Sequence, residues 1–203
     1  MLAPDRQAIA TEAGEGEQQR AAPRFQLMLR PARLICREAE YLGLIRDISA
    51  NGAKIQFFHP VPEACKMAME LREDMVVEME RRWATESSAG YEFASPIDVE
   101  RVLQPDPSHP RRKPRLCLPR PMILTVDGHD VPARLHNISQ QGACIECDYG
   151  LARYQLIRIH IDGIGQRHAK VLWHKQGRYG LVLEETFELR EFACLLAALS
   201  VES

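Results

Sequence analysis

The sequence of 203 residues is long enough for one large domain or for two domains of about 100 residues each. Hydrophobic residues make up 45% of it and the formal net charge is -2, so sizeable cores are possible, and a general nucleic-acid-binding protein, which would be more basic, is not expected. No segment has the apolar length of a membrane span, and the six cysteines follow no disulfide-framework spacing, which favours reduced thiols and a cytoplasmic protein.

The chain begins with a polar stretch of small residues, 1–19, which we expect to be disordered and which lacks the apolar core of a secretion signal. Arg20 and Arg24 follow, four residues apart, in the proline-containing stretch RAAPR. This stretch predicts an arm in front of the first strand rather than a helix face. Arginine pairs in such places are usually solvated charges. Alternatively, their planar guanidinium groups match a phosphate or the O6/N7 edge of guanine.

A turn motif comes next, in RDISANGAKI at residues 46–55. Asp47 offers an oxygen that can accept hydrogen bonds from the N1–H and amino groups of guanine. Ser49 is suited to tie a turn through its hydroxyl, and Gly52 permits a positive φ or the close approach of a ligand. Taken alone, these residues are more typical of an ordinary strand–turn–strand corner.

The first half ends in strands, a short helix and a linker. KMAMEL and MVVEMERRW, on either side of RED, occupy the places of a strand pair, and IDVERVL at residues 97–103 predicts a short helix. The proline-rich QPDPSHP breaks that helix. We therefore expect a first domain at residues 20–104 and a linker at residues 105–110.

The second half, residues 111–203, repeats this order. An arm with Arg111, Arg112 and Arg115 precedes MILTV and ARLHNIS, which flank the turn-prone DGHD and predict a hairpin. CIEC continues the sheet, LIRIHI and HAKVLWH predict a second hairpin around DGIG, and GRYGLVLE adds a last strand. The tail from about Glu185 to Val201 predicts a helix. Its expected apolar face carries Phe192, Leu195, Leu196 and Leu199, with Phe187 leading in.

A constant shift of 90 residues relates the two halves. Upstream of Arg30 the shift becomes 91, which a single-residue difference in a loop would explain. The chain is therefore predicted to be a tandem duplication, and short strands at this spacing predict a small closed or nearly closed barrel in each copy. The shift places Asp47 on Asn137, Ser49 on Ser139, Gly52 on Gly142, Arg30 on Arg120, Trp83 on Trp173 and Gly90 on Gly180.

Other residue groups are weaker candidates for a site. Cys144 and Cys147 have C-x-x-C spacing, but no second pair completes a zinc site, so packing within a strand is the favoured interpretation. Trp83 and Trp173 are expected to pack the barrels, with stacking against a base as the alternative. No nucleophile–base pattern and no metal-ligand spacing is evident, so neither catalytic residues nor a metal site is expected.

An R-x-x-x-R arm followed by a D/N-x-S-x-x-G turn resembles the PilZ family, bacterial receptors for cyclic di-GMP. Arg24 and Asp47 lie 23 residues apart, and Arg115 and Asn137 lie 22 apart. The resemblance covers about residues 20–203. It implies a mainly β chain of two tandem six-stranded antiparallel β-barrels, the second with a C-terminal α-helix. It also implies a receptor rather than an enzyme, with cyclic di-GMP as its ligand and no other cofactor.

The resemblance assigns one set of site residues to each half. Gln19 and Pro110 stand where many members carry a further arginine, so one ligand molecule and a stacked pair per site are both open. Arg112 is placed to add a phosphate contact. The first site would consist of Arg20, Arg24, Asp47, Ser49 and Gly52, and the second of Arg111, Arg115, Asn137, Ser139 and Gly142.

Such a receptor is expected to change its arms and the placement of its domains when ligand binds, and to signal to an unidentified protein partner without nucleic-acid binding or membrane insertion. One alternative is a protein-interaction adaptor of the same fold in which one or both halves bind no nucleotide. Another is a small barrel that binds single-stranded nucleic acid, which the low aromatic content and near-neutral charge disfavour.

Overall fold

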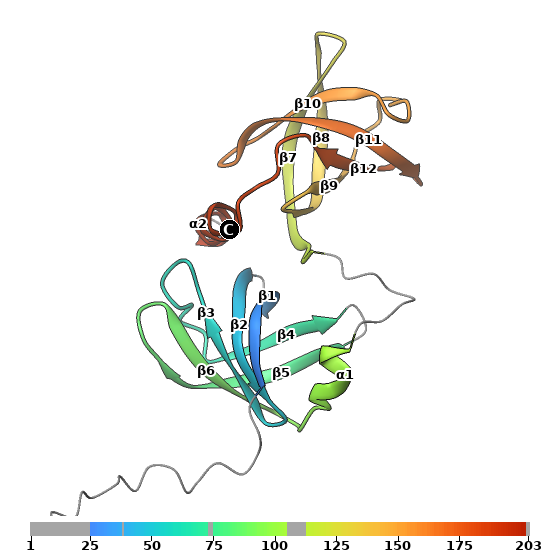
Figure 1. Cartoon of the computed structure of the whole chain (residues 1–203). Coiled ribbons are helices and arrows are strands. Elements are labelled where there is room, and N and C mark those ends of the chain that lie inside the picture. The colour runs from blue at the N-terminus through green and yellow to red at the C-terminus, as the bar shows by residue number, and fades with distance from the viewer. Residues whose placement is uncertain (1–24, 38, 73–74, 105–112, 202–203) are drawn as a thin grey trace, which may run out of the picture.

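The chain forms two β-barrels, one after the other, and a helix follows each of them (Figure 1). The expected disordered tail at residues 1–19 and the expected linker at residues 105–110 lie outside the described residues. The structure is a computed structural model that describes residues 25–37, 39–72, 75–104 and 113–201.

The first barrel is made of six strands and is followed by one short helix. The elements are β1 (Phe25–Cys36), β2 (Ala39–Ser49), β3 (Gly52–Gln56), β4 (Lys66–Arg72), β5 (Met75–Ala84), β6 (Ser88–Phe93) and α1 (Val99–Leu103). Each strand pairs with its neighbours in the order β1-β2-β3-β6-β5-β4, and β1 closes the barrel against β4. All of these pairings are antiparallel.

The second barrel repeats this topology. Its elements are β7 (Leu116–Val126), β8 (His129–Ser139), β9 (Gly142–Glu146), β10 (Leu156–Ile161), β11 (Gly165–Lys175), β12 (Arg178–Leu183) and α2 (Leu189–Val201). The strand order β7-β8-β9-β12-β11-β10 closes between β7 and β10. The prediction of two six-stranded antiparallel barrels, the second with a C-terminal helix, is therefore confirmed.

Helix α2 begins four residues later than expected, at Leu189 instead of about Glu185. The segment before it is held extended against the turn between β8 and β9. Phe187 donates its backbone N–H to the carbonyl of Gln140, and the Gln140 side-chain amide donates to the carbonyl of Phe187 at 3.1 Å. Hydrogen bonds to a distant turn satisfy this backbone, so it does not join the helix.

The one-residue difference between the repeats lies within a strand and not in a loop as expected. β1 pairs with β2 through Gln26 and again from Arg30, whereas β7 pairs with β8 through Cys117 and again from Arg120. The irregular stretch between the paired residues is therefore one residue longer in β1. A bulge can take up an extra residue while the rest of the sheet keeps its register.

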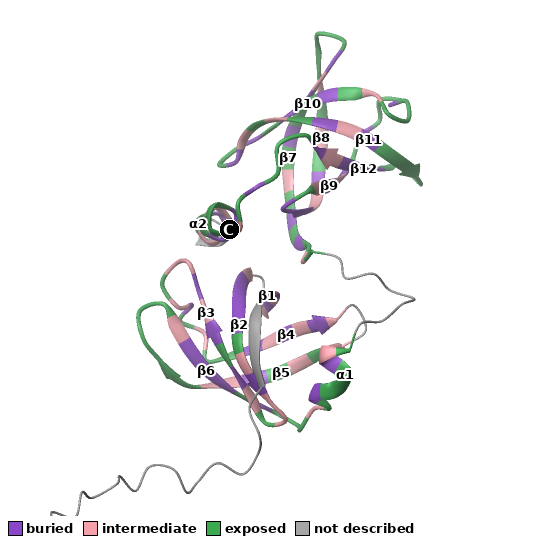
Figure 2. Cartoon of the chain, in the orientation of Figure 1, coloured by how far each residue is buried: buried purple, intermediate pink, exposed green. Residues whose placement is uncertain are grey.

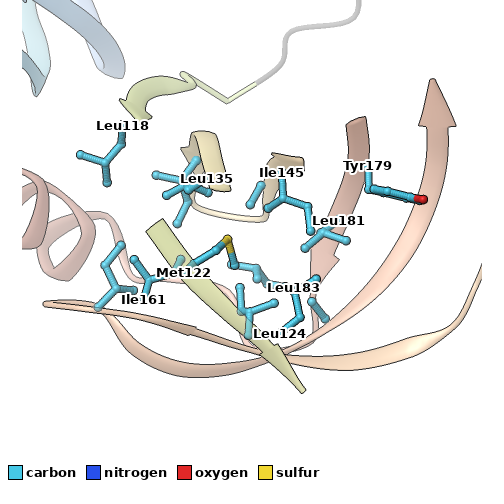
Figure 3. Close-up of a cluster of buried hydrophobic side chains, with 14 of the residues drawn as sticks. Leu118, Met122, Leu124, Leu135, Ile145, Ile161, Tyr179, Leu181 and Leu183 are labelled. Atoms are coloured by element: carbon cyan, nitrogen blue, oxygen red, sulfur yellow. The ribbon is translucent and has the colours of Figure 1, made fainter. Parts of the chain in front are cut away.

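The inner faces of the strands fill each barrel. Along β10, Ile157, Ile159 and Ile161 are buried, and the residues between them are exposed (Figure 2). This alternation is the period-two pattern of a strand with one face against a core. Figure 3 shows side chains from several strands meeting in the second core. The labelled residues are Leu118, Met122, Leu124, Leu135, Ile145, Ile161, Tyr179, Leu181 and Leu183.

Equivalent arginines attach each barrel to the helix that follows it. Arg30 donates to the carbonyl of Val102 in α1 at 2.9 Å, and Arg120 donates to the carbonyl of Leu199 in α2 at 3.3 Å. These carbonyls belong to the last turn of each helix, where backbone acceptors have no partner inside the helix. No helix within the described residues is both long and apolar enough to cross a membrane.

Helix α2 contacts both barrels, between which it lies in Figure 1. Leu42 of β2, only 1% exposed, belongs to the same buried cluster as the core of the second barrel. Arg190 lies over the ring of Phe58, 5.0 Å from its centre, and the Cys194 thiol donates to the Phe58 carbonyl at 3.2 Å. The second barrel and its helix therefore bury part of the outer surface of the first barrel.

Candidate ligand-binding sites

A β-bulge precedes the first residue of each D/N-x-S-x-x-G motif. The register of β2 with β3 shifts between Ile45 and Asp47, and the register of β8 with β9 shifts between Leu135 and Asn137. Bulges re-aim the side chains beside them and are frequent next to functional sites. The structure therefore gives Asp47 and Asn137 the same half-buried position in the two barrels.

The motif serines tie the turns that follow. Ser49 donates its hydroxyl to the carbonyl of Gly52 at 3.3 Å, and Ser139 donates to the carbonyl of Gly142 at 3.2 Å. Side-chain hydroxyls commonly stabilise tight turns by bonding to backbone groups a few residues away. The structural role expected for the serines is confirmed.

The motif glycines are needed for the fold itself, and the close approach of a ligand to them stays a prediction. Neither Gly52 nor Gly142 has a positive φ. A Cβ at Gly52 would lie 2.3 Å from the carbonyl oxygen of Tyr91, and a Cβ at Gly142 would lie 2.2 Å from that of Leu181. These oxygens belong to the adjacent strands β6 and β12. The glycines thus permit two strands to approach closely, which is a requirement of the fold.

In the first barrel, strand register aligns the motif with a tryptophan. Asp47 pairs with Lys54, Lys54 with Gly90, and Gly90 with Trp83, across β2, β3, β6 and β5. The indole covers Gly90, because a Cβ there would lie 2.1 Å from the indole nitrogen. Trp83 remains 46% exposed. It therefore covers the outer surface of the sheet and is not part of the barrel core.

These residues line a cavity of about 270 Å³, the candidate first site. Charged side chains surround it. Arg82 donates its Nε–H to the carboxylate of Glu92 at 2.6 Å, and the Lys54 ammonium lies 6.0 Å from the centre of the Trp83 ring. The cavity thus combines an acceptor, two cations and an aromatic face. Its described lining includes Asp47, Ser49, Asn51, Gly52, Lys54, Arg82, Trp83, Gly90 and Glu92.

The second barrel has the corresponding row, the candidate second site. Asn137 pairs with Cys144, and Cys144 pairs with Gly180, which in turn pairs with Trp173. Trp173 is 43% exposed and covers Gly180, where a Cβ would lie 2.0 Å from the indole nitrogen. A neutral thiol therefore stands where the first site has a lysine.

The second arm ends beside this row. Burial raises the pKa of the Cys144 thiol, and the guanidinium groups of Arg178 and Arg115 partly oppose that rise because they favour the thiolate. Both cations therefore act on Cys144, the cross-strand partner of Asn137, and Cys117, two residues after Arg115, pairs with Asn137 itself. The structure brings the arm residue Arg115 and the turn residue Asn137, 22 positions apart in sequence, to one part of the barrel.

Seven of the eleven predicted site residues are described. The arm arginines Arg20, Arg24, Arg111 and Arg112 lie outside the described residues. The motif residues share a cavity in the first barrel and a turn in the second, and their role in binding stays a prediction. The described residues of the set are Asp47, Ser49, Gly52, Arg115, Asn137, Ser139 and Gly142.

Three cations near the sites were missed by the sequence reasoning. Lys54 and Arg82 line the first cavity, and Arg178 lies near Cys144 in the second site. They lie on β3, β5 and β12, and no motif includes them. Only strand register brings them to the D/N-x-S-x-x-G turn. Comparison of the repeats across the 90-residue shift would have singled out the first two, because Cys144 and Leu172 take their places.

The cysteines and other polar groups suggest no second type of site. All six cysteines are free thiols, and Cys147 is buried in the core while Cys144 is half-buried. Within the described ranges, no three histidine, cysteine or acidic side chains gather so that they could hold a metal ion.

A family model described as "PilZ domain" matches residues 109–199, which include the whole second barrel. The second barrel is a PilZ domain. The match includes Arg115 and the motif from Asn137 to Gly142, so the PilZ domain contains all of the described candidate second site. The sequence-based resemblance to this family is confirmed for this half of the chain. A comparison with curated protein sequences gave no significant match.

Several solved structures are similar at a low level. The PlzA protein of Borreliella burgdorferi in complex with cyclic di-GMP is 12% identical, with 85% of this chain and 88% of that chain covered and a TM-score of 0.36. YcgR of Escherichia coli in complex with cyclic di-GMP is 13% identical, with 85% and 83% covered and a TM-score of 0.36. The Bacillus subtilis inhibitor of motility is 12% identical, with 88% and 97% covered and a TM-score of 0.35. Similarity at this level supports no residue-by-residue comparison with the PilZ domain.

Proposed function

We propose that the chain is a receptor for cyclic di-GMP that signals to a protein partner. The observation that carries the proposal is the strand pairing of Cys117, two residues after Arg115, with Asn137 in the PilZ domain. An arginine fork that can bind phosphate or guanine and an amide oxygen that can accept from guanine are thereby placed together. Two of the similar structures, those of PlzA and YcgR, are complexes with cyclic di-GMP.

The proposal includes both barrels. The first barrel has its own D-x-S-x-x-G turn and a cavity beside it, and the internal repeat relates this site to the one in the PilZ domain. Residues 20–104 and 111–203 would be the two binding domains, with the arms at Arg20–Arg24 and Arg111–Arg115 closing over the ligand. The activity is binding and signalling, without a chemical reaction.

Calorimetric titration with cyclic di-GMP tests whether this dinucleotide is the ligand. We expect saturable binding at both sites, and weaker binding of cyclic di-AMP, because adenine carries an amino donor where guanine offers the O6 acceptor. Losing one such contact costs about 1–3 kcal/mol, or roughly 5- to 150-fold in affinity. Equal affinity for the two dinucleotides would exclude recognition of guanine. If neither dinucleotide binds, the chain is an adaptor that keeps the fold without the ligand.

A contact between the barrels suggests how binding is transmitted. Cys117, two residues after Arg115, donates its backbone N–H to the carboxylate of Glu40 in the first barrel at 2.7 Å. Glu40 also pairs with Arg33, which donates to Glu70 at 2.8 Å. The start of β7 is thus held to the first barrel directly beside the second arm. Ordering of this arm by a ligand would act on the contact between the barrels.

Hydrogen exchange with and without cyclic di-GMP tests this route. We expect slower exchange at the amides of Lys113, Arg115, Leu116 and Cys117 and at Asn137 when ligand binds, because the ligand bridges the arm to the turn. The amides of β10, which pairs with β7 and β11 and not with the motif strands, serve as the internal control. Glu40→Ala removes the first-barrel acceptor and is expected to reduce the protection of Cys117. Confirmed binding without added protection at Lys113 and Arg115, which precede β7, would exclude arm closure.

A further inference from the structure

The internal repeat allows the two candidate sites to be compared position by position. Four charged residues line the first cavity, and strand register identifies their counterparts in the PilZ domain. Glu92 pairs with Gly52 as Val182 pairs with Gly142, and Arg82 and Leu172 both occupy the bulge before the tryptophan. All four counterparts are neutral. The substitutions from first to second site are Asp47 to Asn137, Lys54 to Cys144, Arg82 to Leu172 and Glu92 to Val182.

The first site therefore has two cations on the sheet itself. Lys54 is exposed between the acceptor Asp47 and the ring of Trp83. Arg82, with 55% of its side chain exposed, lines the same cavity from β5, the strand that carries Trp83. In the PilZ domain these two places are occupied by a thiol and an aliphatic side chain. The cations that act on its row are the arm residue Arg115 and Arg178, and the counterpart of Arg178 in the first barrel is Ser88.

Glu92 is the counter-charge of Arg82. Their side chains are about half exposed, and the Arg82 guanidinium also lies 3.9 Å from Glu80. Exposed ion pairs of this kind contribute little to stability, because water screens the charges and two long side chains lose freedom. A phosphate oxygen in the cavity can therefore compete with Glu92 for the guanidinium.

We propose that Lys54 and Arg82 are further ligand-binding residues of the first site, with Arg82 exchanging Glu92 for a phosphate of the bound dinucleotide. The two sites then bind the same dianion by different means. The first uses cations on the sheet that are partly neutralised by Glu92, and the second uses a neutral row with cations only at the arm and at Arg178. This inference rests on the proposed function and adds the chemistry that distinguishes the two sites.

Exchange of residues between the repeats tests the proposal in the full chain. The double variant Lys54→Cys/Arg82→Leu gives the first site the residues of the second, and Cys144→Lys/Leu172→Arg does the reverse. Each replacement residue already occupies the same place in the other barrel, so the fold accommodates it, and melting temperatures verify this. Arg111→Ala/Arg115→Ala silences the second site when the first is measured. Arg20→Ala/Arg24→Ala silences the first site when the second is measured.

Calorimetry with cyclic di-GMP at two ionic strengths measures the effect. The screening length falls from about 30 Å at about 0.01 M salt to about 3 Å at about 1 M. In Lys54→Cys/Arg82→Leu, we expect first-site affinity at low salt to fall about tenfold, with a smaller loss on adding salt than in the parent. Cys144→Lys/Leu172→Arg is expected to make second-site binding more sensitive to salt. Glu92→Val releases Arg82 and is expected to tighten the first site by up to about fivefold.

The outcomes distinguish this inference from the function on which it rests. Binding at both sites with unchanged affinity and salt response in Lys54→Cys/Arg82→Leu overturns the inference alone. Binding only at the second site also overturns it, because the first cavity is then no nucleotide site. If the unaltered chain binds no cyclic di-GMP at either site, the proposed function fails and the inference fails with it.

Discussion

Replacing Gly142 with alanine is expected to lower the free energy of unfolding by about 3 kcal/mol. The new methyl group would lie 2.2 Å from the carbonyl oxygen of Leu181, and this oxygen belongs to a strand that β9 must pair with. Overpacking of a tight site typically costs about 1–3 kcal/mol, and backbone cannot move aside as a flexible side chain can. Urea unfolding of the full chain measures the change.

Gly150→Ala is the matched control for this variant. A Cβ at Gly150 meets nothing within 4 Å, and its φ lies outside the left-handed region, so we expect almost no change in stability. Gly52→Ala is expected to behave like Gly142→Ala, since its Cβ would lie 2.3 Å from the carbonyl oxygen of Tyr91. A Gly142→Ala variant as stable as Gly150→Ala would show that the strands are not held this close.

The close strand approach at Gly142 affects how ligand binding by the D/N-x-S-x-x-G motif can be tested. A Gly142→Ala variant that fails to bind ligand would not show that the glycine contacts the ligand, because the strand pairing around Asn137 would already be disturbed. Substitutions at the exposed arm do not have this difficulty. Arg115 is exposed and precedes the first strand of the PilZ domain.

Replacing Arg115 with alanine is expected to weaken cyclic di-GMP binding at the second site by roughly 5- to 150-fold, which corresponds to the loss of one two-pronged arginine contact of about 1–3 kcal/mol. Arg115 lies two residues before Cys117, which pairs with Asn137, and its charge acts on Cys144, the other cross-strand partner of Asn137. Calorimetry that resolves the two sites should show the first site near its original affinity.

Arg158→Ala provides the control for charge. Arg158 is also an exposed arginine of the PilZ domain, but it lies on β10, which pairs with β7 and β11 and not with the motif strands. We expect its loss to leave both affinities nearly unchanged. An equal loss of affinity in Arg158→Ala and Arg115→Ala would indicate a general attraction of the anion and would contradict a defined arm contact.

The strands, turns and helices could be predicted from the sequence because their signals are local. Alternation along LIRIHI marks β10, and the turn-prone DGHD marks the hairpin between β7 and β8, in which Asp127 and Gly128 both have a positive φ. The repeat reinforced each prediction, since the same order of elements had to fit both halves. Asp98 caps α1 by accepting from the backbone N–H of Arg101 at 3.1 Å, consistent with the short helix expected there.

The features that the sequence did not reveal depend on register between distant strands. Whether Lys54 lies beside Asp47, and whether Trp83 covers Gly90, is decided by bulges that shift the pairing by one residue. No pattern in a single segment specifies such a shift. The position of α2 is a similar case. Its apolar face was predictable, but Leu42, part of its partner surface, lies in the other half of the chain.

The shared burial of Leu42 has a consequence for how the protein comes apart. If the chain were divided between the repeats, the first fragment would expose the apolar side chain of Leu42 on β2. The second fragment would keep helix α2 but lose the part of its packing surface that β2 provides. The unit that was duplicated in the sequence is thus smaller than the unit that folds cooperatively. Isolated halves would be poor substitutes for the whole chain. Their solubility and melting temperatures would reflect the apolar surface that is buried between the halves in the intact protein.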